Sequence, residues 1–288
     1  MSFVKILAPL TGGPDDRATL ASALSAALPF GAHVTGIFVR SDPALAMPFH
    51  ADGVSSAVMQ EIVDSARGAG DGAAAAARQA VETLAREAGV ALVAGAEKHE
   101  APTLAFAEVA GHFAGGVARA ALLGDLVVFV AQHPEERIGV WEAIDAVLLE
   151  ARRPVLLSAK PVPPDFWHRI VVAWNASAAC AQAVSAALPL LKRADFVEVL
   201  CVAAAEAPAP DASDLVDYLA LRGVQARKRD IQAGTRAVAD ALFDAAQEAR
   251  AGLMVLGSHG HSRWRDLFAT STTRQAMRHP EVPLLLMH

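Results

Sequence analysis

The sequence has few of the residues that cross-link small secreted proteins or hold structural metals. Its 288 residues include two cysteines, Cys180 and Cys201, which is too few for a disulfide framework or a four-ligand zinc site. Both have apolar neighbours in the sequence, and this predicts buried thiols in a reducing compartment. We therefore expect a cytoplasmic protein with no bound metal of its own.

Long apolar runs and basic clusters are also scarce. The most apolar stretch, 121–131, contains Asp125 and is too short to span a bilayer. The N-terminal residues lack the charged leader and cleavage site of a signal peptide. The net charge is −6, and the densest basic run, 222–229, is short, which favours a solvated strand edge over a nucleic-acid surface. We expect neither a membrane nor a nucleic acid as a partner.

The sequence also lacks the patterns of common catalytic sites. No G-x-S-x-G nucleophile elbow surrounds any of the four serines Ser177, Ser258, Ser262 and Ser271. Neither a P-loop lysine nor a pair of carboxylates stands beside Gly257, and the nearby Asp266 fits a helix entry. We predict no catalytic residue.

Hydrophobic residues, at 53%, are abundant and follow an internal repeat. Five features recur in the same order in both halves of the chain, at 4–10 and 168–174, 25–29 and 185–189, 33–39 and 196–202, 124–130 and 251–257, and 153–159 and 282–288. The proline-rich segment 158–168 between them disfavours both helix and central strand. The pattern predicts two domains, 1–159 and 166–288, with extra length in the middle of the first.

Each copy alternates short β-rich runs with Ala- and Leu-rich helical segments. The β-rich runs lack strict polar alternation, as expected of strands buried on both faces of a parallel sheet. The first copy has a longer helical stretch, at about 58–88. We therefore predict an α/β fold made of two tandem three-layer α/β/α domains, each with a mainly parallel five-stranded sheet.

The candidate site lies in the closing segment of the chain. Gly257-Ser258-His259-Gly260 follows the apolar run 253–256, and ligands of open parallel sheets bind outside the carboxyl ends of the strands. Glycines let backbone N–H groups approach a phosphate, and the N-terminus of a following helix adds partial positive charge. Thr270, Ser271 and Thr272 supply hydroxyls at the start of that helix. A plain strand-to-helix turn would also fit these residues.

The spacing in this segment resembles the universal stress protein family. ATP-binding members carry G-x2-G-x9-G-[S/T] between the fourth strand and the last helix, and Gly257, Gly260 and Ser271 match that pattern. The resemblance implies an adenine nucleotide alpha hydrolase-like fold and a site for ATP, with magnesium, in the second half only. Because no catalytic group is found beside that site, we expect at most a weak ATPase activity. It implies a site lined by Asn175, Val202, Gly257, Ser258, Gly260, His261, Arg263, Thr270, Ser271 and Thr272.

Two residues depart from the family pattern. Thr270 stands where the third glycine belongs, and Asn175 stands where nucleotide-binding members have aspartate after the first strand. A β-branched residue is strained if that position needs a positive φ, and an amide lacks the charge of a carboxylate. In the first half, Thr11 takes the first-strand position, and Glu135 and Glu136 lie where an anion would bind. Because carboxylates repel phosphate, we expect no ATP in that half.

Two functions therefore stay open. The first is a stress-response protein whose second half binds ATP or a related nucleotide. The second is a stress protein without nucleotide that acts as a dimerisation and interaction scaffold. The family resemblance implies that the last strands of the two halves, 153–159 and 282–288, pair as an intramolecular pseudo-dimer, and it allows a homodimer.

Overall fold

A computed structural model describes residues 2–41, 56–95, 99–130, 139–204, 208–258 and 282–288. The first half of the chain contains β1 (Lys5–Leu10), α1 (Asp16–Ala27), the 3-10 turn η1 (Leu28–Phe30), β2 (His33–Arg40), α3 (Ser56–Ala88), β3 (Ala91–Leu92), β4 (Thr103–Ala110), α4 (Phe113–Ala121), β5 (Leu126–Val130), α5 (Val140–Leu149) and β6 (Val155–Ser158). The second contains β7 (Arg169–Ala173), α6 (Ala178–Leu191), β8 (Phe196–Ala204), α7 (Ser213–Leu221), β9 (Ala226–Gly234), α8 (Val238–Glu248), β10 (Leu253–Gly257) and β11 (Leu284–Met287).

The strands form one 11-stranded sheet in the order β3-β4-β2-β1-β5-β6-β11-β10-β7-β8-β9. The order β4-β2-β1-β5-β6 in the first half matches β9-β8-β7-β10-β11 in the second, so the sequence repeat is also a structural repeat. The first half adds the two-residue edge strand β3 to the five strands expected. Neighbouring strands run parallel except at the junction, where β6 and β11 are antiparallel.

The junction between the halves is made of leucine-rich strands. Leu284, Leu285 and Leu286 pair with Leu157, Leu156 and Val155, and all six side chains are fully buried. Each of these strands also has a parallel neighbour on its other side, β5 for β6 and β10 for β11. Both strands are therefore central, and the edges of the whole sheet are β3 and β9.

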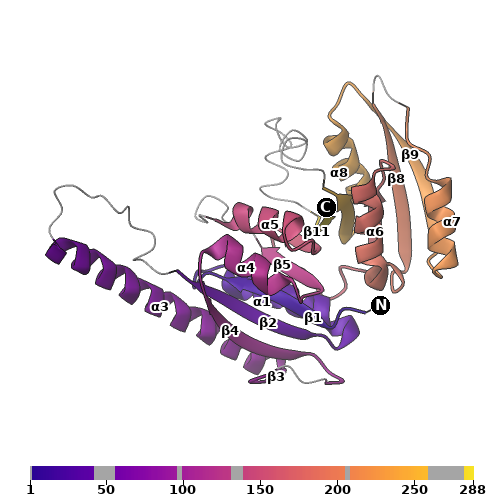
Figure 1. Cartoon of the computed structure of the whole chain (residues 1–288). Helices are drawn as coiled ribbons and strands as arrows, with labels where there is room; N and C mark the ends of the chain where they lie inside the picture. Colours follow the sequence, from indigo (N-terminus) through magenta and orange to yellow (C-terminus); the bar gives the residue numbers. More distant parts are fainter. Residues whose placement is uncertain (1, 42–55, 96–98, 131–138, 205–207, 259–281) are drawn as a thin grey trace.

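Helices cover both faces of this sheet and complete the three layers (Figure 1). One hydrophobic cluster holds apolar side chains of α1, α3, α6 and α7, and the other holds those of α4, α5 and α8. Both clusters contain residues from the first and the second half. The α/β fold with mainly parallel sheets is thus confirmed, whereas the division into domains 1–159 and 166–288 stays a prediction.

The extra length of the first half lies in α3, as predicted. This helix has 33 residues, whereas its counterpart α7 has nine. Its C-terminal part packs on β2 and β4 through side chains such as Ala77 and Val81, and its N-terminal part extends beyond the sheet (Figure 1). Within the described ranges, no helix is both long enough and apolar enough to cross a membrane.

The proline-rich segment between the halves packs into the core. Val162 and Phe166 are buried, and the Val162 N–H donates to the Ser22 hydroxyl on α1 at 2.9 Å. The backbone of Phe166 lies so close to Gly252 that a Cβ at Gly252 would be 2.2 Å from the Phe166 carbonyl oxygen. The segment therefore contributes to the core in addition to connecting the halves.

Candidate functional site

The second half has its topological switch point between β7 and β10. The chain leaves β7 through α6 to β8 on one side, whereas β10 lies on the other side of β7. Ala173, the last residue of β7, is in register with Leu256 of β10. The residues that come next in the chain, Trp174 and Gly257, therefore lie side by side. Open parallel sheets bind ligands at this kind of position because adjacent loops diverge there.

Gly257 lies directly against the first turn of α6. A Cβ at this position would be 2.3 Å from the Cys180 nitrogen and 2.6 Å from the Ala179 carbonyl carbon, closer than real Cβ contacts come. Only glycine fits here without moving the helix. The turn after β10 consequently starts at the positive end of α6, where backbone N–H groups favour anions.

Ser258 continues this turn and is buried. Its N–H donates to the Met287 carbonyl at 2.7 Å, which completes the last pair of β10 and β11, Gly257 with Met287. This hydrogen bond anchors the start of the candidate loop to β11.

Asn175 and Ser177 organise the connection from β7 to α6. The Ser177 N–H donates to Asn175 Oδ1 at 3.1 Å, and the Cys180 N–H donates to Ser177 Oγ at 3.2 Å. Ser177 is therefore the N-cap of α6, and Ala176 between the two adopts φ +56°. Asn175 is exposed at the carboxyl edge of the sheet, although its side-chain oxygen already accepts a backbone hydrogen bond.

Val202 lies farther along β8, beyond the end of β7. The last paired residue of β7, Ala173, is opposite Leu200, and Val202 comes two residues later, where it pairs with Ile231 of β9. Val202 is partly exposed, and it lies at the carboxyl ends of the strands, as do Asn175 and Gly257. The other predicted site residues, Gly260, His261, Arg263, Thr270, Ser271 and Thr272, lie outside the described residues.

The corresponding corner of the first half is closed by its own carboxylate. Asp16 accepts hydrogen bonds from the Thr11 N–H at 2.9 Å and the Gly12 N–H at 2.8 Å. Asp15 is the N-cap of α1 by position, with no capping bond from its side chain, and the carboxylate of Asp16 reaches back to the turn after β1. Burial raises the pKa of Asp16 above its usual value, and the two backbone hydrogen bonds oppose that rise.

Asp16 therefore accepts the hydrogen bonds of the backbone N–H groups that follow β1, at the position that Asn175 occupies after β7. No feature of the sequence distinguished this contact from ordinary capping, because both use an acid beside a glycine turn. The loop residues Glu135 and Glu136, which we expect to repel an anion in this half, lie outside the described residues.

The two cysteines are buried, as predicted from their neighbours. Burial raises the pKa of the Cys201 thiol to about 11, so the nucleophilic thiolate is scarce at neutral pH. The Cys180 thiol donates to the Ala173 carbonyl at 3.4 Å and joins α6 to β7. Across the described part of the chain, no three histidine, cysteine or acidic side chains gather as metal ligands would.

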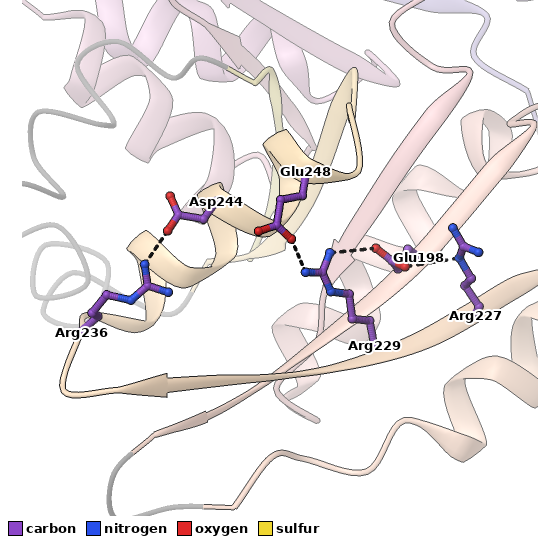
Figure 2. A network of polar contacts seen from close by, with 6 residues as sticks. All are labelled: Glu198, Arg227, Arg229, Arg236, Asp244 and Glu248. Carbon is purple, nitrogen blue, oxygen red and sulfur yellow. Dashed lines mark hydrogen bonds and ion pairs between the residues drawn. The ribbon is translucent and has the colours of Figure 1, made fainter.

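The basic run 222–229 ends on the edge strand β9, and two of its arginines, Arg227 and Arg229, are paired with acids (Figure 2). The buried Glu198 of β8 lies 3.3 Å from Arg227 Nε and 3.8 Å from Arg229 Nη1. Arg229 also contacts Glu248 on α8. These carboxylates reduce the positive charge of the edge, in agreement with the predicted solvated strand.

Comparisons with known proteins identify the second half. The model of the universal stress protein family matches residues 167–288. Residues 167–288 therefore form a universal stress protein domain. The resemblance seen in the sequence is therefore confirmed for the region that contains the candidate site.

Solved structures extend the likeness to the whole chain. A universal stress protein from Archaeoglobus fulgidus DSM 4304 matches with a TM-score of 0.59 and 14% identity, covering 98% of this chain and 95% of the other. A protein from Pseudomonas aeruginosa UCBPP-PA14, described as a universal stress protein, matches with a TM-score of 0.50 and 15% identity over 99% and 93% of the two chains. At these identities the likeness shows the fold. No curated protein sequence matches the chain.

Proposed function

We propose that the second half of this universal stress protein binds an adenine nucleotide, with its phosphates at the turn that begins at Gly257. The contact between Gly257 and the first turn of α6 carries this proposal, because it brings the turn to a helix N-terminus at the switch point of the sheet. The family pattern adds Gly260 and Ser271 as phosphate-binding residues, with Ser258, His261, Arg263, Thr270 and Thr272 around them.

Asn175 and Val202 would contact the rest of the nucleotide. Asn175 is exposed beside the turn, and its Nδ2 group can donate to a ribose or phosphate oxygen while Oδ1 holds Ser177. Val202 offers a partly exposed apolar surface for the adenine ring on the same edge. Among the described residues of this corner, the side chains supply amide and hydroxyl oxygens, so magnesium would be held mainly by the phosphates.

The proposal is tested by calorimetric titration of the intact protein with Mg-ATP. We expect Thr270→Gly to bind at least about fivefold more tightly than the natural sequence, because glycine removes strain and a side chain from the phosphate turn. Thr273→Gly, the same substitution in the same segment but outside the motif, is the control and should leave affinity unchanged. The absence of heat at millimolar nucleotide for both the natural sequence and Thr270→Gly would overturn the proposal.

The alternative is a scaffold without nucleotide, and the junction between the halves is the observation that favours it. The antiparallel pairing of β6 and β11 has the form of a dimer contact built within one chain. Because both strands already have neighbours on each side, a further copy of the protein would have to use another surface. A protein that fails to bind nucleotide in the titration above would favour this function.

A further inference from the structure

A crevice of about 480 Å³ lies where the two halves meet. It runs along the flank of α6 opposite the one that packs in the core. The first half contributes Phe3, Asp125, Arg152 and Arg153 to its walls. The second contributes one flank of α6 and Met287 at the end of β11. Its volume suits a small organic ligand.

The crevice combines apolar walls with two arginines. Phe3, Pro189 and Met287 provide the apolar surface, whereas Arg152 and Arg153 provide two positive charges. The one carboxylate in the lining, Asp125, accepts hydrogen bonds from the Val4 and Lys5 N–H groups at 2.7 and 2.9 Å. The lining therefore carries a net positive charge of one, and its acid is already engaged.

The arginines have hydrogen-bonding capacity to spare. Arg153 Nη2 donates to the Leu122 carbonyl at 2.6 Å, but within the described ranges its buried Nε has no acceptor. Arg152 is exposed, and the described residues offer its guanidinium no hydrogen bond or ion pair. The exposed guanidinium of Arg152 is therefore the donor that an oxyanion in the crevice can reach.

Arg152 also has a backbone conformation that glycine would adopt more easily. Its φ is +51° in the turn after α5, where the Ala151 N–H donates to the Ala146 carbonyl at 3.1 Å. Arg250, with φ +49°, occupies the equivalent turn after α8 and does not line the crevice. The two arginines share a backbone geometry and differ in what their side chains face, which makes them a matched pair.

We propose that this crevice binds a small molecule with a phosphate or carboxylate head group and a short apolar body. The head group lies against Arg152 and Arg153, and the body packs on Phe3, Pro189 and Met287. Guanidinium groups suit both kinds of head group, since each presents oxygens in a plane that two N–H groups can reach. This site is separate from the turn at Gly257 and does not depend on nucleotide binding.

The test uses hexyl phosphate and hexanoate, with hexanol as the neutral control of equal chain length. Binding is followed by calorimetry and by the NMR signal of the Met287 methyl group, identified from its loss in Met287→Leu. We expect saturable binding of at least one anion, a shift of the Met287 signal, and no binding of hexanol at the same concentrations. The tighter of the two anions identifies the head group that the site prefers.

Two glycine variants then locate the site. Arg152→Gly should fold at least as well as the natural sequence, because it relieves the positive φ, and should bind the anion about tenfold more weakly, because it removes a charged donor. Arg250→Gly should gain similar stability and keep full affinity. Equal affinity in the two variants, no saturable binding of either anion, or displacement of the anion by Mg-ATP would each overturn the proposal.

Discussion

At the scale of single residues, Gly257 has a role that its motif does not reveal. In the sequence it is the first glycine of a phosphate-binding pattern, whereas in the fold its missing side chain lets β10 contact the backbone of α6. The same residue therefore supports both the core and the candidate site. A loss of nucleotide binding on its substitution would not by itself show that it touches the ligand.

We predict that Gly257→Ala lowers the free energy of unfolding by about 2 kcal/mol or more, because the new methyl group would overlap the Cys180 backbone, 2.3 Å away. Gly68→Ala in α3 is the control, since no atom lies within 4 Å of the added Cβ. That variant should gain up to about 1 kcal/mol from helix propensity. Urea unfolding of both variants measures the difference, and equal stabilities would show that α6 moves freely away from β10.

At the scale of elements, the central strands β6 and β11 decide whether the halves stay together. Leu285 is fully buried and pairs with Leu156 across the junction. The edge strand β9 carries charged side chains instead of leucines, and its arginines pair with Glu198 and Glu248 (Figure 2). Charged side chains on an edge strand disfavour association with further strands, whereas leucines in the middle of a sheet favour it.

Leu285→Lys should therefore destabilise the protein strongly. A lysine there would place an unpaired charge in the core, and we expect a loss of at least about 3 kcal/mol in the free energy of unfolding. Leu123→Lys is the matched control, because Leu123 is 82% exposed and its replacement should cost at most about 0.5 kcal/mol. An unchanged melting temperature and mass for Leu285→Lys would contradict the importance of the junction.

At the scale of the whole molecule, the sheet and both hydrophobic clusters run through the two halves. We predict that the intact chain unfolds in one cooperative transition. Variants that keep only Trp141 or only Trp174 report on the first and the second half by fluorescence. Coincident thermal transitions are expected because both hydrophobic clusters contain residues from the two halves. Two separate transitions would show instead that 1–159 and 166–288 are independent domains.

Much of the architecture could be predicted from local patterns. The helical stretch expected at 58–88 is α3, Ser56–Ala88, because a long run of Ala, Glu and Arg has one favourable local conformation. The strand expected at 253–256 is β10 with one more residue, because apolar β-rich runs between helices are buried in parallel sheets. Of the predicted site residues, Asn175, Val202, Gly257 and Ser258 lie at the same edge of the sheet, as the strand order requires.

The sequence by itself determined the repeat, the alternation of strands and helices, and the family of the second half, since these depend on composition and spacing along the chain. Only the tertiary structure decided which groups meet across long separations. It turned Asp16 back onto Thr11, placed Gly257 on α6, and assembled the crevice from Asp125, Arg152 and Met287. These contacts depend on how packed elements lie in space, and no local pattern encodes that arrangement.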